Sequence, residues 1–232
     1  MIERAALLAA LGTVRDPELD EPLTDLGFVQ AIDEHGGMVD VRLRLPTYFC
    51  APNFAYLMAA DARAAVLGVP GVEGARVTLV DHFAAGEVNA GVGGELGFEE
   101  AFAGLADGEL DELRTLFRRK AFVVRQERVA RALSLPAEAL AALALGQLPA
   151  GSPDVSAYLE RRAELGLAVG AGEPFLVRPN GDPVPVEAAA ETLRFARTVR
   201  VSLEGNAELC RGLLETRYAG ERGIGEREAV AA

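Results

Sequence analysis

The chain has 232 residues, half of them apolar and a quarter charged, which is typical of a globular protein with one large domain or two small ones. Its net charge of -12 argues against nucleic acid and anionic membranes as partners, because both bind basic surfaces. No segment has the ~18 consecutive apolar residues of a membrane span, and the first residues lack a signal-peptide pattern. We therefore expect a cytoplasmic protein in which the two cysteines stay reduced.

The first third of the sequence predicts a small domain of alternating helices and strands. Strand segments are recognised by apolar residues at every second position, and helices by Ala- and Leu-rich stretches bounded by Pro or Gly. The predicted elements are, in chain order, a helix over residues 2–13, strands over 28–32 and 39–45, a helix from Pro52, and a strand over 74–83. This α-β-β-α-β order predicts a two-layer domain over residues 1–83.

The rest of the chain has a different pattern. Gly-rich residues 84–94 predict a linker, and residues 95–220 predict a mostly helical domain whose last helix breaks near Gly205. The Asn180-Gly181 pair between two prolines predicts one short, exposed hairpin. Residues 221–232 are expected to form a flexible tail. The expected fold class is α+β, with an α/β N-terminal domain followed by a mostly α-helical C-terminal region.

Cys50 lies at the turn between the second predicted strand and the following helix. The N-terminus of a helix carries positive potential, which favours the thiolate, and the thiolate is the form that binds metal or acts as a nucleophile. A small buried core residue is the alternative, since free cysteine is among the most buried residue types. The turn alone does not decide between them.

Two other groups of side chains could contribute to chemistry. Carboxylates crowd the turn after the first helix and could ligate iron or manganese, although turn and capping roles are commoner. Asp81 and His82 end the third predicted strand, and His82 with Cys50 could bind metal or form a base and nucleophile pair. A capping or surface role for His82 is the alternative. The carboxylates of the turn are Asp16, Glu18, Asp20, Glu21 and Asp25.

Two features of the helical region have simpler interpretations. Cys210 lies among leucines in a helical pattern, so core packing is its expected role. Six basic residues between Arg118 and Arg131 predict a solvated helix face, which could also bind an acidic partner.

The N-terminal segments "DPELDEPLTDLGFVQAI", "VDVRLRLPTYFC" and "VPGVEGARVTLV" resemble the small iron–sulfur assembly family that includes the SufT and PaaD proteins. The matching motifs are Asp16-Pro17-Glu18, Asp25-Leu26-Gly27, Thr47 and Cys50, in the order and spacing of the family. The resemblance spans residues 4–81. In this family a proline commonly follows the cysteine directly, whereas here Ala51 stands between Cys50 and Pro52.

The resemblance implies the same α-β-β-α-β fold and a role that is not catalytic. It implies a metal-centre maturation factor that helps to assemble or deliver an iron–sulfur cluster or other iron centre to a client metalloprotein or an assembly scaffold. Cys50 would be the reactive residue, and Asp16, Glu18, Asp25 and Thr47 would shape its pocket. Because one cysteine cannot complete a cluster site, the iron or cluster is expected to bind transiently, across a homodimer or with the client, or not at all in the isolated chain.

The later segment "RTVRVSLEGNAELCRGLLETRY" resembles longer, actinobacterial-type family members associated with soluble diiron monooxygenases. This resemblance implies a diiron oxygenase as the client. Two alternatives stay open. One is a non-catalytic scaffold or chaperone that binds an oxygenase subunit through the helical half. The other is an enzyme with Cys50 as nucleophile and His82 as base, which requires these two side chains to be within hydrogen-bond reach.

Overall fold

The computed structural model describes residues 2–94 and 109–220, and the chain divides into two units. One unit comprises residues 1–110 and 206–232, and the other comprises residues 111–205. The boundaries differ from the expected 1–83 and 95–220, because the last turns of the final helix cluster with the N-terminal domain. The expected tail over 221–232 lies outside the described residues.

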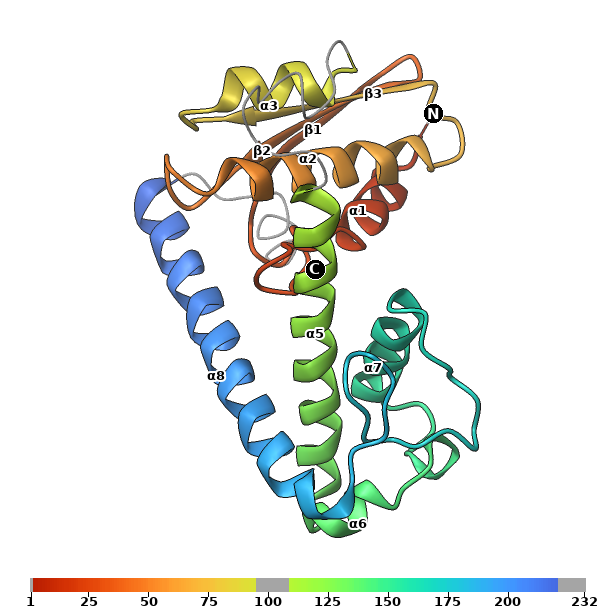
Figure 1. The fold of residues 1–232 in the computed structure, drawn as a ribbon. Helices are drawn as coiled ribbons and strands as arrows, with labels where there is room; N and C mark the ends of the chain where they lie inside the picture. Colours follow the sequence, from red (N-terminus) through yellow and green to blue (C-terminus); the bar gives the residue numbers. More distant parts are fainter. Residues whose placement is uncertain (1, 95–108, 221–232) are drawn as a thin grey trace. The chain divides into compact units, whose positions relative to one another are not determined.

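The N-terminal unit confirms the predicted order of helices and strands (Figure 1). Strands β1 and β2 form an antiparallel hairpin, and β3 pairs with β2 in parallel, giving the strand order β1-β2-β3. The parallel pairing requires a crossover, which α2 provides. The elements are α1 (Arg4–Gly12), β1 (Val29–His35), β2 (Met38–Arg44), α2 (Pro52–Leu67) and β3 (Gly74–Val80).

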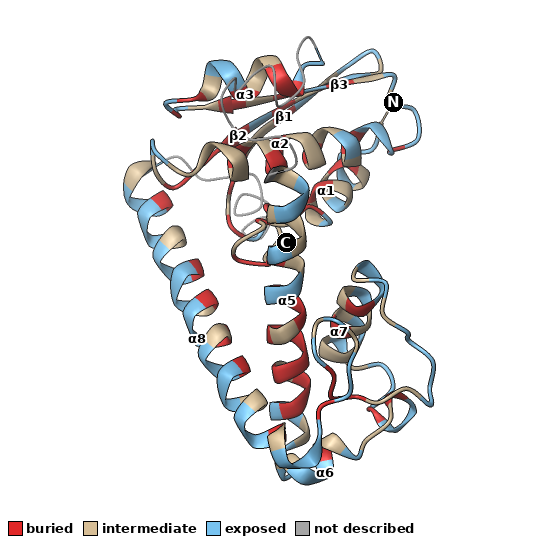
Figure 2. Ribbon diagram, in the orientation of Figure 1, coloured by how far each residue is buried: buried red, intermediate tan, exposed pale blue. Residues whose placement is uncertain are grey.

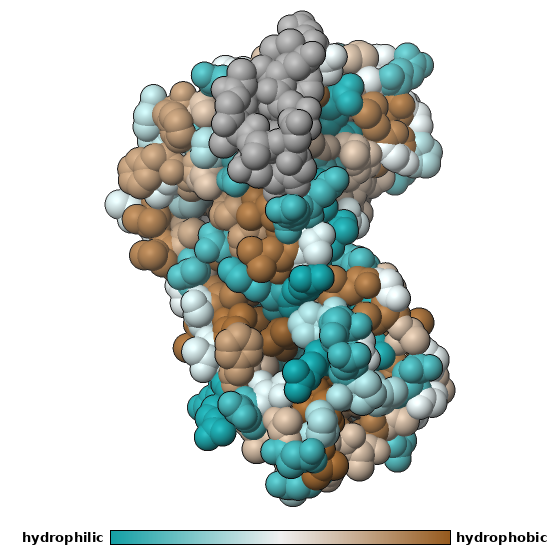
Figure 3. Space-filling model, viewed as in Figure 1, coloured by the Kyte–Doolittle hydropathy of each residue, from teal (hydrophilic) through white to brown (hydrophobic). Residues whose placement is uncertain are grey.

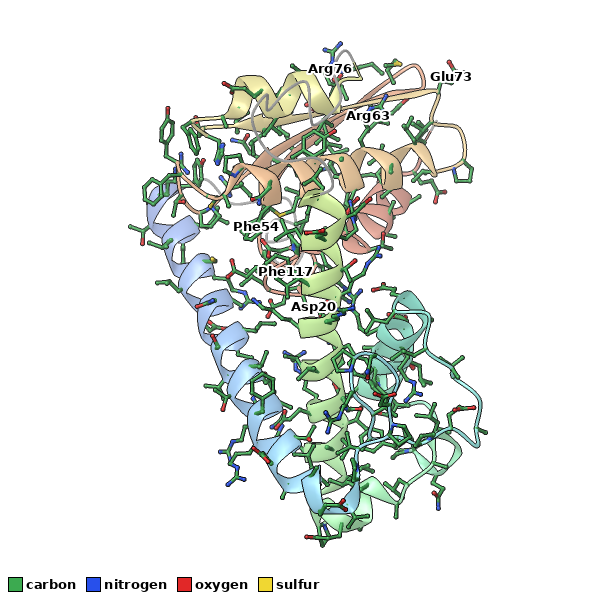
Figure 4. All side chains as sticks on the ribbon, in the orientation of Figure 1. Asp20, Phe54, Arg63, Glu73, Arg76 and Phe117 are labelled. Carbon is green, nitrogen blue, oxygen red and sulfur yellow. The ribbon has the colours of Figure 1, made fainter. Side chains whose placement is uncertain are left out.

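The core of this unit lies between one face of the sheet and the helices. Alternate residues of the central strand, Val39, Val41 and Leu43, are buried, because successive side chains of a strand point to opposite faces. Buried residues concentrate on the sheet and on part of α2 (Figure 2). Arg63 of α2 donates a hydrogen bond to the carbonyl oxygen of Ala75 in β3 at 3.1 Å (Figure 4), which ties the helix to the sheet.

The prediction of a linker over residues 84–94 is wrong, because α3 (Ala85–Val92) occupies most of this segment. The helix buries Val88 and Val92 in the core of the N-terminal unit. Its Asn89 side chain accepts a hydrogen bond from the Leu79 N–H (2.7 Å) and donates one to the Leu79 carbonyl oxygen (3.0 Å). These two bonds satisfy backbone groups of β3, an edge strand, which would otherwise be open to another strand.

The second unit is mainly helical, as expected. A tyrosine in its centre, Tyr158, is fully buried and donates a hydrogen bond to the Phe175 carbonyl oxygen at 2.6 Å. Buried ion pairing joins α5 to α8, since Arg200 Nε lies 2.5 Å from Glu127 Oε2. Its elements are α5 (Glu109–Leu133), α6 (Ala137–Ala141), the 3₁₀ helix η1 (Leu145–Gln147), α7 (Pro153–Glu164) and the first part of α8 (Val186–Arg217).

Two details of the helical unit differ from expectation. The Asn180-Gly181 turn is present and carries a single bridge between Val177 and Pro183. The segment before it is buried rather than exposed, because Phe175, Leu176 and Val177 pack into the core. The expected break near Gly205 is absent, and α8 continues through this residue to Arg217.

Candidate functional site

Cys50 lies in the short loop between β2 and α2, directly before the helix cap Ala51. Pro52 is the first residue of α2, so the loop and the helix start are where the sequence predicts them. The thiol is half-buried, and its sulfur lies 3.1 Å from the hydroxyl oxygen of Thr47. A hydroxyl at this distance can donate to a thiolate, so the structure brings together two of the predicted site residues.

His82 supports the Cys50 loop through the backbone. The imidazole is buried, its Nε2 lies 2.7 Å from the Cys50 carbonyl oxygen, and its Nδ1 accepts a hydrogen bond from the Ala84 N–H at 3.2 Å. Because Nδ1 is the acceptor, Nε2 carries the proton and donates it to Cys50. Burial lowers the pKa of His82 below 6.5, the hydrogen bond to Cys50 raises it, and nearby Arg217 lowers it further. His82 is therefore neutral at pH 7.

This geometry bears directly on the expected roles of His82. Both ring nitrogens are engaged by backbone groups, so no lone pair faces a metal ion or the Cys50 thiol. Across the part of the chain that the structure describes, no three His, Cys, Asp or Glu side chains are arranged to hold a metal ion. In this structure His82 contacts the backbone of the Cys50 loop and neither ring nitrogen is placed to accept a proton from the thiol. A metal-ligand role for His82 stays a prediction.

The acidic turn is built around Asp16. Its buried carboxylate accepts hydrogen bonds from the backbone N–H groups of Glu18 (2.8 Å) and Leu19 (2.9 Å). The pKa of Asp16 is raised to about 6. Burial is the main cause and the charges of Glu18 and Glu21 add to it, while the two backbone hydrogen bonds act in the opposite direction. These hydrogen bonds close the turn, so the structure gives Asp16 the turn-forming role that is commoner for such carboxylates. A ligand role for Asp16 or Glu18 stays a prediction.

Asp25 is exposed and accepts a hydrogen bond from the Thr24 hydroxyl at 3.1 Å. The glycine of the same motif has a clearer structural role. Gly27 has a φ of +73°, and an added Cβ would lie 3.2 Å from the Leu214 side chain. Both conditions favour glycine, so the Asp-Leu-Gly step shapes the turn on which α8 packs. A ligand role for Asp25 stays a prediction.

The last turns of α8 lie beside this site, which the sequence did not predict. Ala207 and Leu214 are buried in the same core as the sheet, and Cys210 packs against that core. The pKa of Cys210 is raised to about 11, chiefly by burial and then by the negative charges around it, while Arg211 lowers it.

Arg217 and Tyr218 attach the end of α8 to both strand ends that border Cys50. Arg217 donates to the Leu45 carbonyl oxygen at 3.0 Å and to that of Asp81. The Tyr218 hydroxyl donates to the Asp81 carboxylate at 3.1 Å. The third strand was expected to extend over residues 74–83, but β3 ends at Val80. Asp81 is exposed and its backbone is left-handed, with a φ of +52°, which ends the strand.

Three exposed aromatic side chains border the Cys50 loop. Tyr48, Phe49 and Phe83 are 56%, 74% and 52% exposed, and the rings of Tyr48 and Phe83 lie 6.3 Å apart. The Phe83 N–H donates to the Tyr48 carbonyl oxygen at 3.0 Å, which joins the loop before α2 to the residues after β3. Hydrophobic surface gathers over this part of the N-terminal unit at the upper left of Figure 3. An exposed apolar patch of this kind is typical of an interaction surface.

Comparison with known proteins identifies the N-terminal domain. Residues 4–79 match the family model described as "Iron-sulfur cluster assembly protein". An iron–sulfur cluster carrier protein of Deinococcus radiodurans is 38% identical over 72 residues, 31% of this chain and 20% of that protein. Those of Mycobacterium bovis and Mycobacterium tuberculosis are each 42% identical over 76 residues, 32% of this chain and 19% of theirs. No solved structure matches the chain.

Residues 4–79 therefore match the iron–sulfur cluster assembly family, in agreement with the resemblance of their motifs. The chain spans about a fifth of the length of the curated relatives it matches. Its helical unit lies outside the matched segment. None of the helices within residues 2–94 and 109–220 is long and apolar enough to cross a membrane.

Proposed function

We propose that this protein carries an iron–sulfur cluster, or the iron for another metal centre, to a client protein, and that Cys50 holds the cargo. The observation that supports this proposal is the position of Cys50 within the family-matched domain. Its thiol is half-buried beside the Thr47 hydroxyl, and its backbone is held by His82. Thiolates are the preferred ligands of iron–sulfur clusters, so the donor fits the cargo.

The same site accounts for release of the cargo. No complete set of metal ligands surrounds Cys50 among the described residues, so other ligands must come from the client or from a second copy of this chain. A cargo held by few ligands can be passed on by ligand exchange. The protein therefore acts as a carrier rather than as a catalyst in this proposal.

The client would bind at the aromatic side chains beside Cys50. Tyr48, Phe49 and Phe83 present apolar area directly beside the thiol, where a client must bind to accept the cargo. The resemblance of the later segment to longer family members supports a soluble diiron monooxygenase as the client. A cytoplasmic location belongs to this proposal, because a carrier that uses free thiols requires a reducing compartment.

A transfer assay tests the proposed carrier. The chain is loaded anaerobically with ferrous iron and sulfide, and transfer to an apo-ferredoxin is followed by circular dichroism of the acceptor cluster. We expect transfer from the wild-type chain and none from Cys50→Ser, whereas the control His35→Ala, at an exposed residue of the β1–β2 hairpin, should transfer normally. Equal transfer by Cys50→Ser and wild type would contradict the proposal.

The helical unit supports a second candidate function, a scaffold that binds the client without carrying its metal. An open pocket of about 600 Å³ lies among side chains of α5, α6 and α8. Arg200 in this pocket is held by Glu127 and Glu204. The other cations have no ion-pair partner among the described residues. The lining side chains include the apolar Ala130, Leu135, Leu140 and Leu193 and the cationic Arg131, Arg194 and Arg197.

Free arginines beside apolar side chains fit an acidic, partly apolar segment of a client. The probe for this function is a labelled amphipathic peptide with Glu on one face and Leu on the other, compared with its Gln version by fluorescence anisotropy. Scaffolding predicts that the Glu peptide binds the wild-type chain and that Arg194→Glu with Arg197→Glu removes the binding. Equal binding of the Glu and Gln peptides would contradict this function.

A further inference from the structure

The position of the Cys50 thiol depends on two neighbouring strand ends. The Cys50 loop begins after Arg44, the last residue of β2, and His82 lies two residues after Val80, the last residue of β3. Arg44 and Val80 are paired in the parallel part of the sheet. Because His82 donates to the Cys50 carbonyl oxygen, a shift of either strand end would move the loop.

One side chain of α8 contacts both of these strand ends. The guanidinium of Arg217 donates to the Leu45 carbonyl oxygen at 3.0 Å through one nitrogen and to the Asp81 carbonyl oxygen through another. Leu45 is the first residue after β2, and Asp81 is the first residue after β3. Arginine suits this bridge because its planar group presents several N–H donors in fixed directions. Arg217 thus links the start of the Cys50 loop to the segment that carries His82.

Tyr218 adds contacts at the same two strand ends. Its hydroxyl donates to the Asp81 carboxylate at 3.1 Å, and its ring centre lies 4.5 Å from the guanidinium of Arg44 and 5.2 Å from that of Arg217. Attraction between a guanidinium and an aromatic ring is stronger away from water, and Arg44 is buried. Asp81 has a left-handed backbone, which costs free energy and persists where surrounding contacts hold it. Arg217 and Tyr218 together are called the α8 clasp below.

We propose that Arg217 is a positioning residue for Cys50, so that the end of α8 sets how often the thiol is exposed. This inference rests on the proposed function, in which Cys50 holds the cargo. It adds a control from outside the family-matched residues 4–79, which contain Cys50 but neither His82 nor the α8 clasp. Without the clasp, the two strand ends are no longer joined through α8, and the loop between them opens more often.

Alkylation of the unloaded full chain by iodoacetamide tests this inference, with modification counted on the Cys50 peptide by mass spectrometry. We expect Arg217→Gln to raise the alkylation rate of Cys50 by about tenfold, because the loop loses hydrogen bonds from a charged group. Tyr218→Phe, which removes only the hydroxyl, should raise it by about threefold. The matched control is Arg211→Gln, which removes the ion pair between α8 and Glu21 in the acidic turn and should leave the rate unchanged.

The outcomes separate the α8 clasp from the proposed carrier. Arg217→Lys keeps a cationic donor and should bring the rate back toward that of the wild type. An unchanged rate in Arg217→Gln would overturn the positioning role, and so would an equal rise in Arg217→Gln and Arg211→Gln, because general loosening of the helix end would then explain both. Alkylation needs no metal, so a faster rate in Arg217→Gln without cluster transfer by the wild-type chain would support the clasp and overturn the carrier.

Discussion

His82 illustrates how a residue outside the family-like motifs can organise the site. It is one of only two histidines in the chain, and it donates to the Cys50 carbonyl oxygen while accepting from the Ala84 N–H. A buried carbonyl that loses its hydrogen-bond partner costs free energy comparable to the lost bond. The imidazole thus keeps the Cys50 loop in one conformation, without touching the thiol.

Replacing His82 should loosen the loop that carries Cys50. We expect His82→Ala to lower the free energy of unfolding by about 1–3 kcal/mol, because the Cys50 carbonyl oxygen loses its donor and a cavity remains. Urea denaturation measures the stability, and alkylation of Cys50 by iodoacetamide measures its accessibility. The control is His35→Ala, since His35 is exposed in the β1–β2 hairpin. Equal stability of the two variants would contradict the positioning role.

Asp16 makes stability depend on pH in a defined direction. Its folded pKa of about 6 lies above the ordinary value of 3.8. Between these values the folded chain retains a proton that the unfolded chain has released, so the free energy of unfolding falls as the pH rises through this window. Above it the loss is about 3 kcal/mol, which follows from the size of the shift.

The Asp16→Asn substitution should remove this dependence. Its amide oxygen can accept the same backbone hydrogen bonds from Glu18 and Leu19 but carries no charge. We expect the variant to be more stable than the wild type at pH 7, by up to about 3 kcal/mol, and the difference to shrink below about pH 4. Denaturation at several pH values measures it, with the exposed Asp25→Asn as control. A difference that does not change with pH would contradict the assignment.

Sequence patterns located the thiol at its turn but could not assign the surrounding roles. Cys50, Thr47 and the start of α2 follow from local spacing, which a sequence displays directly. The pairing of His82 with a backbone carbonyl depends on the approach of two loops, and Cys210 depends on the return of a helix from the far end of the chain. Such long-range contacts leave no local signal beyond the rarity of cysteine in this sequence.

At the scale of elements, α3 shows why a glycine-rich segment can still be helical. Glycines lower helix propensity, which favours a linker, but burial of Val88 and Val92 outweighs that cost. The five other elements of the N-terminal domain were predicted correctly because their apolar periodicity is strong. The flanking prolines predicted an exposed ribbon around Asn180-Gly181, but the segment before this turn is buried. Prolines indicate a turn or an edge and carry no information on burial.

Asn89 tests the role of α3 as a cover for the edge of the sheet. We expect Asn89→Ala to cost about 1–2 kcal/mol, because the Leu79 N–H and carbonyl oxygen lose both partners. Hydrogen exchange should show faster exchange at the Leu79 amide, and the exposed Glu87→Ala on the same helix is the control. Slow exchange at Leu79 in the Asn89 variant would show that another group protects the strand.

At the scale of the whole molecule, the residues of α8 are divided between the two units. Its first part belongs to the helical unit and its last turns belong to the domain of the assembly family. In the proposed function, the chain combines a site for cargo in one unit with a helical unit that binds a partner. The sequence predicted two units, but it assigned the whole final helix to the helical one. In the structure the residues from 206 onward cluster with the N-terminal unit.

The most direct test of the central claim is anaerobic iron binding by the full chain, with iron and sulfide counted and absorbance recorded for wild type and Cys50→Ser. The account predicts that the wild-type chain retains iron and that Cys50→Ser loses it, because the substitution removes a thiolate ligand while the loop keeps its His82 anchor. Equal retention of iron by the two proteins, or none by either, would contradict a carrier that holds its cargo through Cys50.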